Sequence, residues 1–191
     1  MMEELLIDKK DFECIGQVAK HCDWEQLCIF IREQQNLSLL PKIGQCLFMA
    51  IYDNIVNEKG DETLDEIWNG SQYIGCDGKD RIHFGLKRSL VHWAYGAYIY
   101  RHSAIDTQFG LVQKVNKDSV PVEMKEARNM NIEQRNNAKY YFDMTKDFIC
   151  SVKSDLDCNV CDCGCECSYC AGGGKTLQNR GNRFGNVYKK I

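Results

Sequence analysis

The sequence predicts a mainly α-helical bundle that carries a small β-hairpin. Apolar residues recur at helical spacing in several stretches, and over residues 86–102 they occupy almost every side of the predicted helix. The pair Asp77-Gly78 lies between short apolar stretches and is typical of a hairpin turn. The length of 191 residues is close to one domain of ordinary size, so the chain can bury a core without metal or crosslinks.

The amino-terminal part predicts two helices. The first spans residues 23–35, because Asp23 can cap its amino end in a capping-box-like start and apolar residues follow at helical spacing. Residues 36–38 are expected to break this helix. Pro41 is tolerated in the first turn of the next helix, whose apolar stripe covers residues 40–55. We expect the two helices to form an antiparallel pair joined by a short loop.

The following elements alternate in type. A short helix around Leu64 and Trp68 should end at Gly70, and residues 71–84 should form the hairpin. The helix over residues 86–102 should lie at the centre of the core or between neighbouring elements. Residues 106–121 predict an extended excursion. A long helix is then expected over residues 122–152, and at 1.5 Å per residue it would span roughly 45 Å.

The composition changes after Val152, so we expect a helical domain over residues 1–152 and a cysteine-rich, basic extension over residues 153–191. The last 17 residues, 175–191, carry five cations and no acid. The chain's formal charge of −3 less this +5 leaves −8 on the remainder. The net charge of −3 is too small to indicate a dedicated nucleic-acid or membrane-surface binder, although the basic tail could dock on an acidic neighbouring subunit or on phosphates. No apolar stretch approaches the roughly 20 residues of a membrane span, and no secretory signal is expected at the amino terminus.

Twelve cysteines fall into two groups. The scattered ones lie in apolar or helical patterns and are expected to act as small core residues. The clustered ones are candidate metal ligands: Cys158, Cys161, Cys163, Cys165, Cys167 and Cys170. Their thiolates could wrap a structural Zn²⁺, pair as disulfides after release from a cell, or stay reduced and loosely ordered. The two Cys-x2-Cys pairs lie closer together than in a standard zinc module, so all three alternatives remain open.

No motif predicts an enzyme. The stretch around Gly174-Lys175-Thr176 resembles a phosphate loop, but Tyr169 stands where that loop needs its first glycine. The histidines are His21, His83, His92 and His102, and none has metalloprotease spacing. We expect them to be surface residues or to be hydrogen-bonded inside the core. A cysteine or metal hydrolase remains a third class of function, which loss of activity on replacing one His or Cys would reveal.

Several segments, in this order and spacing, resemble head-to-tail connector proteins of tailed phages, of the crAss-like and Bacteroidetes phage type. The amino-terminal segments are Trp24-Glu25-Gln26-Leu27, Ile31-Arg32-Glu33-Gln34-Gln35-Asn36-Leu37 and Leu40-Pro41-Lys42-Ile43-Gly44. The later segments are Gly85-Leu86-Lys87-Arg88-Ser89-Leu90-Val91, Thr107-Gln108-Phe109-Gly110-Leu111-Val112-Gln113-Lys114 and Asp118-Ser119-Val120-Pro121. The resemblance covers residues 3–152 and does not extend to the cysteine-rich tail.

The resemblance implies a structural, non-enzymatic virion protein at the neck of the particle, assembled in the host cytoplasm. It implies a homo-oligomeric ring, of 12 copies if it follows the portal, which extends the channel for double-stranded DNA without reading its sequence. Its partners would be the portal and the next neck or tail protein. The expected contact residues of the excursion are Phe109, Gly110, Gln113, Lys114, Asn116 and Ser119. Those of the tail are Lys175, Arg180, Arg183, Lys189 and Lys190.

An alternative reading of the residues is a small zinc-binding nucleic-acid or regulatory adaptor. In that case the cysteine cluster would fold around the metal and the basic end of the chain would contact phosphates. It predicts DNA binding that depends on the tail and weakens steeply with salt.

Overall fold

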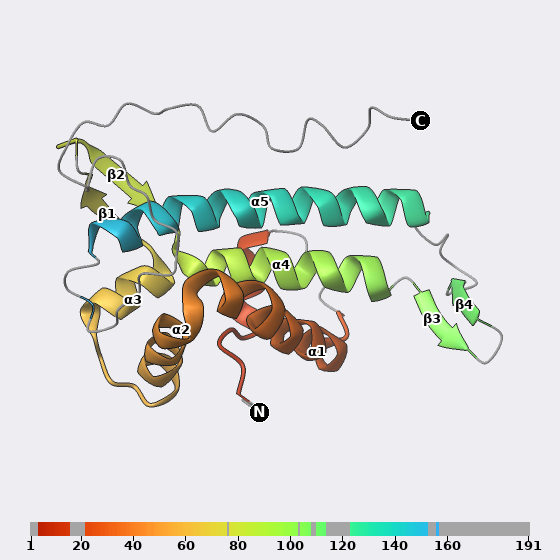
Figure 1. Cartoon of the computed structure of the whole chain (residues 1–191). Helices are drawn as coiled ribbons and strands as arrows, with labels where there is room; N and C mark the ends of the chain where they lie inside the picture. Colours follow the sequence, from red (N-terminus) through yellow and green to blue (C-terminus); the bar gives the residue numbers. More distant parts are fainter. Residues whose placement is uncertain are drawn as a thin grey trace, which may run out of the picture.

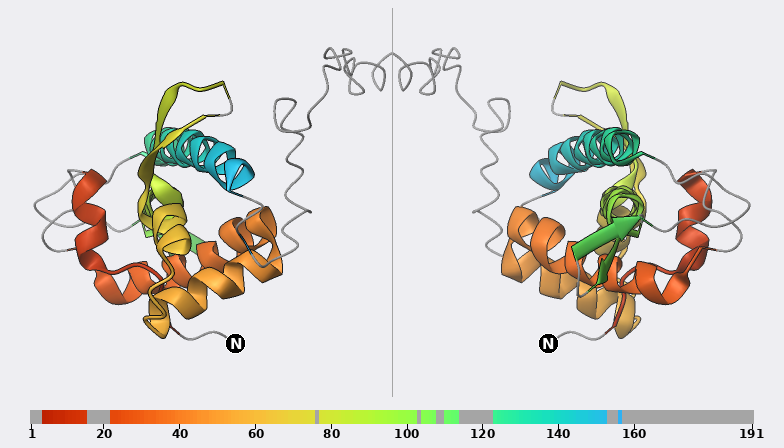
Figure 2. Two further views of the ribbon diagram at one scale, coloured as in Figure 1. Left: turned by 90° about the vertical axis from the view of Figure 1, so that its left-hand side faces the viewer. Right: turned by 90° about the vertical axis from the view of Figure 1, so that its right-hand side faces the viewer.

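The computed structural model describes residues 4–15, 22–75, 77–102, 104–107, 110–113, 123–152 and 156. These residues form a mainly α-helical bundle, as predicted (Figure 1). The helix α5 (Met124–Ser151) lies along α4 (Gly85–His102), and α4 in turn packs on the amino-terminal helices. The end-on views of Figure 2 show the same layering, with α4 between α5 and the helices below it.

The amino-terminal helix begins as predicted. Helix α1 (Trp24–Gln34) is capped by Asp23, whose Oδ1 accepts a hydrogen bond from the Gln26 N–H at 3.2 Å. Its apolar side chains Leu27 and Ile31 are fully buried. The local capping chemistry of the sequence therefore sets where this helix starts.

The predicted break at residues 36–38 is wrong. The chain continues through a π-helical turn, η2 (Gln35–Leu39), directly into α2 (Leu40–Val56). The wider turn lies just ahead of Pro41, which lacks an N–H and whose ring would otherwise crowd the carbonyl four residues earlier. The change of direction comes instead at Gly44, whose φ of 79° and ψ of 159° are non-helical. Glycine tolerates this conformation because it has no Cβ.

The π turn carries a buried polar side chain, Gln35. Its side chain is only 1% exposed. Its Oε1 accepts from the Leu6 N–H at 3.0 Å, and its Nε2 donates to the Glu4 carbonyl at 3.4 Å. A buried amide with both ends hydrogen-bonded thus fastens the amino-terminal segment, including the 3-10 turn η1 (Lys9–Ile15), to the helices.

Helix α4 is the centre of the molecule, as its all-round apolar pattern predicted. It contacts α1, α3 (Glu62–Asn69), α5 and η1. Leu86 and Leu90 are fully buried. Gly96 allows α5 to approach closely, because a Cβ there would lie 2.9 Å from the Cβ of Gln134. The core therefore depends on α4 being covered on nearly all of its sides.

Helix α5 confirms the predicted long carboxy-terminal helix. It buries one stripe against α4, with these residues buried: Ala127, Ala138, Phe142, Thr145, Phe148 and Ile149. The rest of its surface is mostly polar. Such a one-sided helix is typical of the outer layer of a bundle.

Two antiparallel hairpins complete the fold. The predicted hairpin is formed by β1 (Ser71–Ile74) and β2 (Asp80–His83). A second one, β3 (Ala104–Thr107) paired with β4 (Gly110–Gln113), lies where the sequence predicted only an extended excursion. The excursion therefore begins with a hairpin that the sequence did not predict. Residues 114–122 of the excursion lie outside the described residues.

Candidate functional site

The structure describes only part of the predicted contact set. Gly110 and Gln113 begin and end β4, opposite Thr107 and Ala104 of β3. The other predicted contact residues and metal ligands lie outside the described residues: Phe109, Lys114, Asn116, Ser119, the six clustered cysteines and the five cations of the tail. The β3–β4 hairpin extends past the end of α4, whereas the β1–β2 hairpin lies at the opposite end of the α4–α5 pair (Figure 1).

The base of the β1–β2 hairpin is a close crossing of two backbone segments. Gly70 precedes β1 and Gly85 follows β2, and both have positive φ, 96° and 76°. A Cβ on Gly85 would lie 2.2 Å from the Trp68 carbonyl oxygen, and one on Gly70 would lie 2.6 Å from the His83 carbonyl oxygen. Real side chains do not fit at such distances, so the crossing requires glycine on both sides. The hairpin is thereby held rigidly on α3 and α4.

The inner face of this hairpin packs on α5 through His83. The imidazole is 2% exposed and stacks on Phe148, with ring centroids 4.2 Å apart and planes 18° from parallel. Tyr73 contacts both rings edge-on. The Nε2 atom of His83 is 3.1 Å from the Ser71 hydroxyl, and its Nδ1 has no hydrogen-bond partner among the described atoms. Burial lowers the pKa of His83 to about 4, so the ring is neutral near pH 7.

The Ser71–His83 pair has part of the geometry of a nucleophile and its base. A catalytic arrangement also needs a third group that orients the imidazole. No carboxylate takes that role at Nδ1 among the described residues. We interpret the pair as a packing and hydrogen-bonding contact that joins the hairpin to α5.

The outer face of the β1–β2 hairpin is apolar and exposed. Ile74 is 71% exposed and Ile82 is 46% exposed. The pairing register places both isoleucines on the face opposite His83, with Gln72 and Asp80 beside them. A shallow cavity of about 380 Å³ lies along these two strands. The sequence showed the hairpin, but it gave no signal that both isoleucines would face outward.

A second polar group lies between α4 and α5. The guanidinium of Arg88 is 5.1 Å from the centroid of Phe84 and 4.8 Å from that of Tyr141. His92 stacks on Tyr141, and its Nδ1 is 2.6 Å from the Gln134 side-chain oxygen. Burial, reinforced by Arg88, lowers the pKa of His92, although the hydrogen bond to Gln134 opposes the shift. Each buried histidine thus has one ring nitrogen hydrogen-bonded, as expected of a core histidine. The other ring nitrogen of each has no hydrogen-bond partner among the described atoms.

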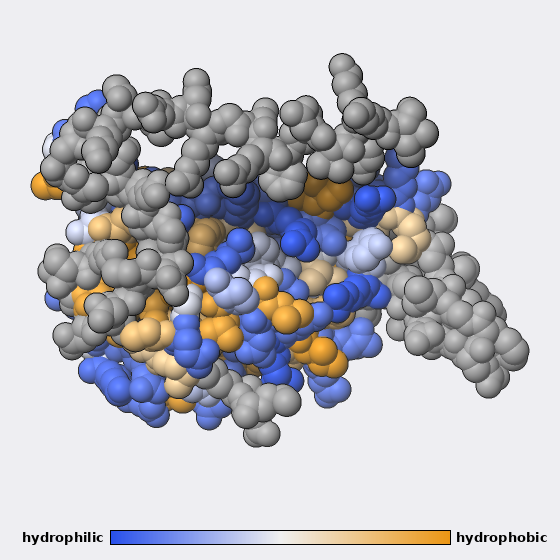
Figure 3. Space-filling model, in the orientation of Figure 1, coloured by the Kyte–Doolittle hydropathy of each residue, from blue (hydrophilic) through white to orange (hydrophobic). Residues whose placement is uncertain are grey.

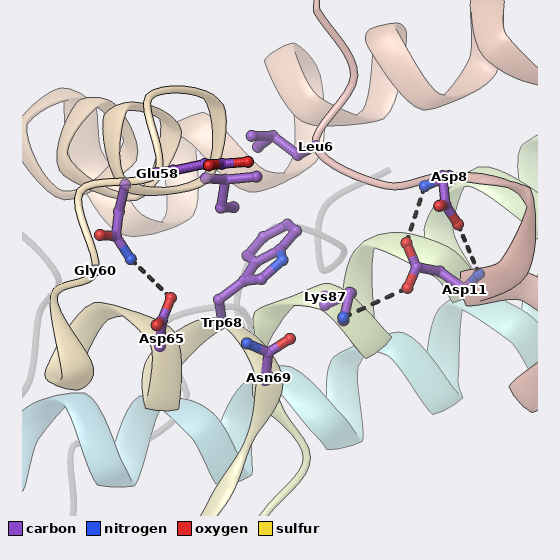
Figure 4. Close-up of a pocket in the computed structure, with 11 residues that line it drawn as sticks. Leu6, Asp8, Asp11, Glu58, Gly60, Asp65, Trp68, Asn69 and Lys87 are labelled. Atoms are coloured by element: carbon purple, nitrogen blue, oxygen red, sulfur yellow. Dashed lines mark hydrogen bonds and ion pairs between the residues drawn. The ribbon is translucent and has the colours of Figure 1, made fainter.

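An open groove of about 470 Å³ lies between the amino-terminal segment, α2, α3 and α4 (Figure 4). Its floor includes Trp68 and its rim is acidic, with Asp8, Asp11, Glu58 and Asp65 against one cation. That cation is Lys87, which pairs with Asp11 at 3.4 Å. The side-chain amide of Asn54 donates to Asp65 at 2.8 Å. The acidic rim gives this end of the molecule a negative surface.

The described ranges contain several carboxylates, histidines and cysteines. Among these residues no group of three or more His, Cys, Asp or Glu side chains could hold a metal ion. No helix in the part of the chain that is described is long and apolar enough to cross a bilayer. Cys22, Cys28 and Cys150 are half-buried. Cys46 departs from the expected core role, because it is exposed at the surface of α2.

Residues 43–167 match the profile of DUF6712, described as a family of unknown function. The match covers more than half of the chain. The chain belongs to this family. The DUF6712 region contains α4, α5 and both hairpins, and it continues through Cys167, past the domain boundary expected near residue 153. Neither the curated proteins nor the solved structures give a match.

Proposed function

We propose that this DUF6712 protein is a structural subunit of a phage neck, which forms a ring between the portal and the tail and extends the DNA channel. One structural observation carries the proposal: the two hairpins lie at opposite ends of the α4–α5 pair (Figure 1). A subunit of a closed ring meets its two neighbours through two different surfaces. The separated hairpins give this chain two such surfaces.

Surface character supports the same function. Polar and apolar side chains are mixed over the face seen in Figure 3. Between Asp53 and Glu66 the chain carries six carboxylates and one lysine, most of them at least partly exposed. A negative surface repels DNA phosphates, which suits a channel through which DNA slides without sticking. The order of motifs shared with head-to-tail connectors supports the assignment to the neck.

Native mass spectrometry of the full chain tests the proposal. The chain is measured alone and with the portal encoded by the same genome, in a reducing buffer. We expect a complex with one chain per portal subunit, 12 of each if the ring follows the portal. Absence of any portal complex, together with a monomer that captures DNA, would contradict the connector function.

The second candidate is a zinc-binding nucleic-acid or regulatory adaptor. The observation that favours it is that the DUF6712 match includes five of the six clustered cysteines, Cys158 to Cys167. Thiolates of this density suit Zn²⁺, and the five cations that follow suit phosphates. The same mass measurement detects a structural metal in either candidate, because a bound zinc adds a fixed mass to each chain. Salt-dependent DNA binding that disappears without residues 153–191 would favour the adaptor.

A further inference from the structure

Within the described part of the chain, both hairpins have strand edges without a neighbouring strand. Each sheet has only two strands, and among the described residues no third strand pairs with either one. Two-stranded sheets are marginally stable by themselves and are usually completed by further strands or by packing. An unpaired strand edge presents a row of N–H and C=O groups that can pair with another chain.

The charges along the strands distinguish one edge of each hairpin from the other. Strand β2 carries Asp80 and Arg81, and β3 carries Asp106. Charged side chains on an edge strand oppose pairing with another chain. Strands β1, of sequence SQYI, and β4, of sequence GLVQ, carry no charge and no proline. Each hairpin therefore has one edge protected by charge and one edge open to pairing.

Strand β1 also has an apolar side chain to cover. Ile74 is 71% exposed, although large apolar side chains are usually buried. It lies on the outer face of the hairpin, away from the His83–Phe148 contact. A strand added beside β1 would pass along this isoleucine and remove part of it from water. Such burial of apolar surface favours association.

The open edges β1 and β4 cannot meet within one copy, because they lie at opposite ends of the molecule (Figure 1). They can meet between two copies arranged head to tail. We propose that β1 of one copy pairs with β4 of a second copy of this chain. The contact forms a four-stranded sheet in the order β2-β1-β4-β3, with the two charged strands at its outer edges. It rests on the proposed function, since a ring needs such a contact between neighbouring copies.

Two single-site variants of the full chain test this contact. I74K places a charge on β1, and V112K places one on β4. Each variant retains one open edge and loses the other, so neither can associate with itself. An equimolar mixture can form one contact, between β4 of I74K and β1 of V112K. Analytical ultracentrifugation in a reducing buffer should show wild-type assemblies, monomers of each variant alone, and a mixed species of twice the 22.0 kDa monomer mass.

The control is I82K, which adds the same charge to β2 of the same hairpin. Ile82 is 46% exposed, and β2 stays at an outer edge of the proposed sheet, so I82K should assemble like the wild type. Circular dichroism checks that each variant is folded, and Q113K replaces V112K if that variant is not. A mixture that stays monomeric, or a single variant that dimerises with itself, overturns the contact. Portal binding is measured separately, so an intact portal complex beside a monomeric mixture would retain the proposed function and reject only this contact.

Discussion

Protonation of His83 should destabilise the fold below pH 6.5. The imidazole is 2% exposed, it stacks on Phe148, and its Nδ1 has no hydrogen-bond partner among the described atoms. Burial lowers the pKa of His83 to about 4 from 6.5. Between these two values the unfolded chain binds the proton and the folded chain does not. Stability is therefore fully present above pH 6.5 and is lost as the pH falls toward 4.

The size of the effect follows from the two pKa values. One pKa unit corresponds to 1.36 kcal/mol, so the free energy of unfolding should fall by about 1.3 kcal/mol between pH 7.5 and 5.5 on account of His83 alone. This window lies above the usual range in which carboxylates titrate. The lowered pKa of His92 adds a loss of the same sign in the wild type.

Urea unfolding followed by tryptophan fluorescence measures the loss. It compares the wild type with H83F and H83Q at pH 7.5, 6.5 and 5.5. The Phe and Gln side chains differ in size and polarity, so the two variants should differ in absolute stability. In both variants the free energy of unfolding should nevertheless fall by about 1.3 kcal/mol less than in the wild type between pH 7.5 and 5.5, because neither side chain titrates. Variants that keep the full wild-type slope would refute the assignment of this slope to His83.

Three further predictions concern the backbone, the domain boundary and the cysteine cluster. G85A should lower the free energy of unfolding by at least about 2 kcal/mol, because the added Cβ would meet the Trp68 carbonyl. The control G60A should lower it by about 1 kcal/mol, because residue 60 has a φ of 72° but no atom close to the added Cβ. Equal losses in urea unfolding would argue against the tight crossing. A chain ending at Val152 should keep its helical circular dichroism. Its free energy of unfolding should fall by about 1 kcal/mol, because the contact of Leu156 with the core is lost. A truncation that does not fold would place the boundary elsewhere. Under reducing conditions the full chain should gain the mass of bound zinc, and replacing Cys158, Cys161, Cys167 and Cys170 by serine should abolish the gain; an unchanged mass on adding zinc to the wild type would exclude that role for the cluster.

Local signals in the sequence predicted much of the fold. The Asp23 cap, the all-round apolar pattern of α4 and the Asp77-Gly78 turn each act within a few residues, and the structure confirms the elements that they predicted. The predicted break at residues 36–38 failed because a tertiary contact decides that turn. The buried Gln35 amide is hydrogen-bonded to Leu6 and Glu4, which lie 29 and 31 positions earlier in the sequence. These contacts keep the chain helical at residues 36–38.

The candidate site was less predictable, because it also depends on contacts between segments far apart in the sequence. The outward direction of Ile74 depends on which face of the hairpin packs against Phe148, a residue 75 positions after Tyr73 in the sequence. The close approach at Gly70 and Gly85 also joins segments that no local pattern connects. The connector function, the metal and the tail contacts stay predictions, because most of their residues lie outside the part of the chain described by the structure.

The central position of α4 has a consequence for synthesis on the ribosome. Residues 24–56 leave the ribosome before α4 and α5, and they carry apolar side chains such as Leu27, Ile31 and Phe48 that are buried in the finished fold. The helix that covers α1 ends only at His102, and α5, which covers α4, ends at Ser151. At about 5–20 residues per second, the nascent chain therefore exposes these side chains for several seconds before it can fold. An abundant protein of this architecture would depend on chaperones during translation more than its finished surface suggests.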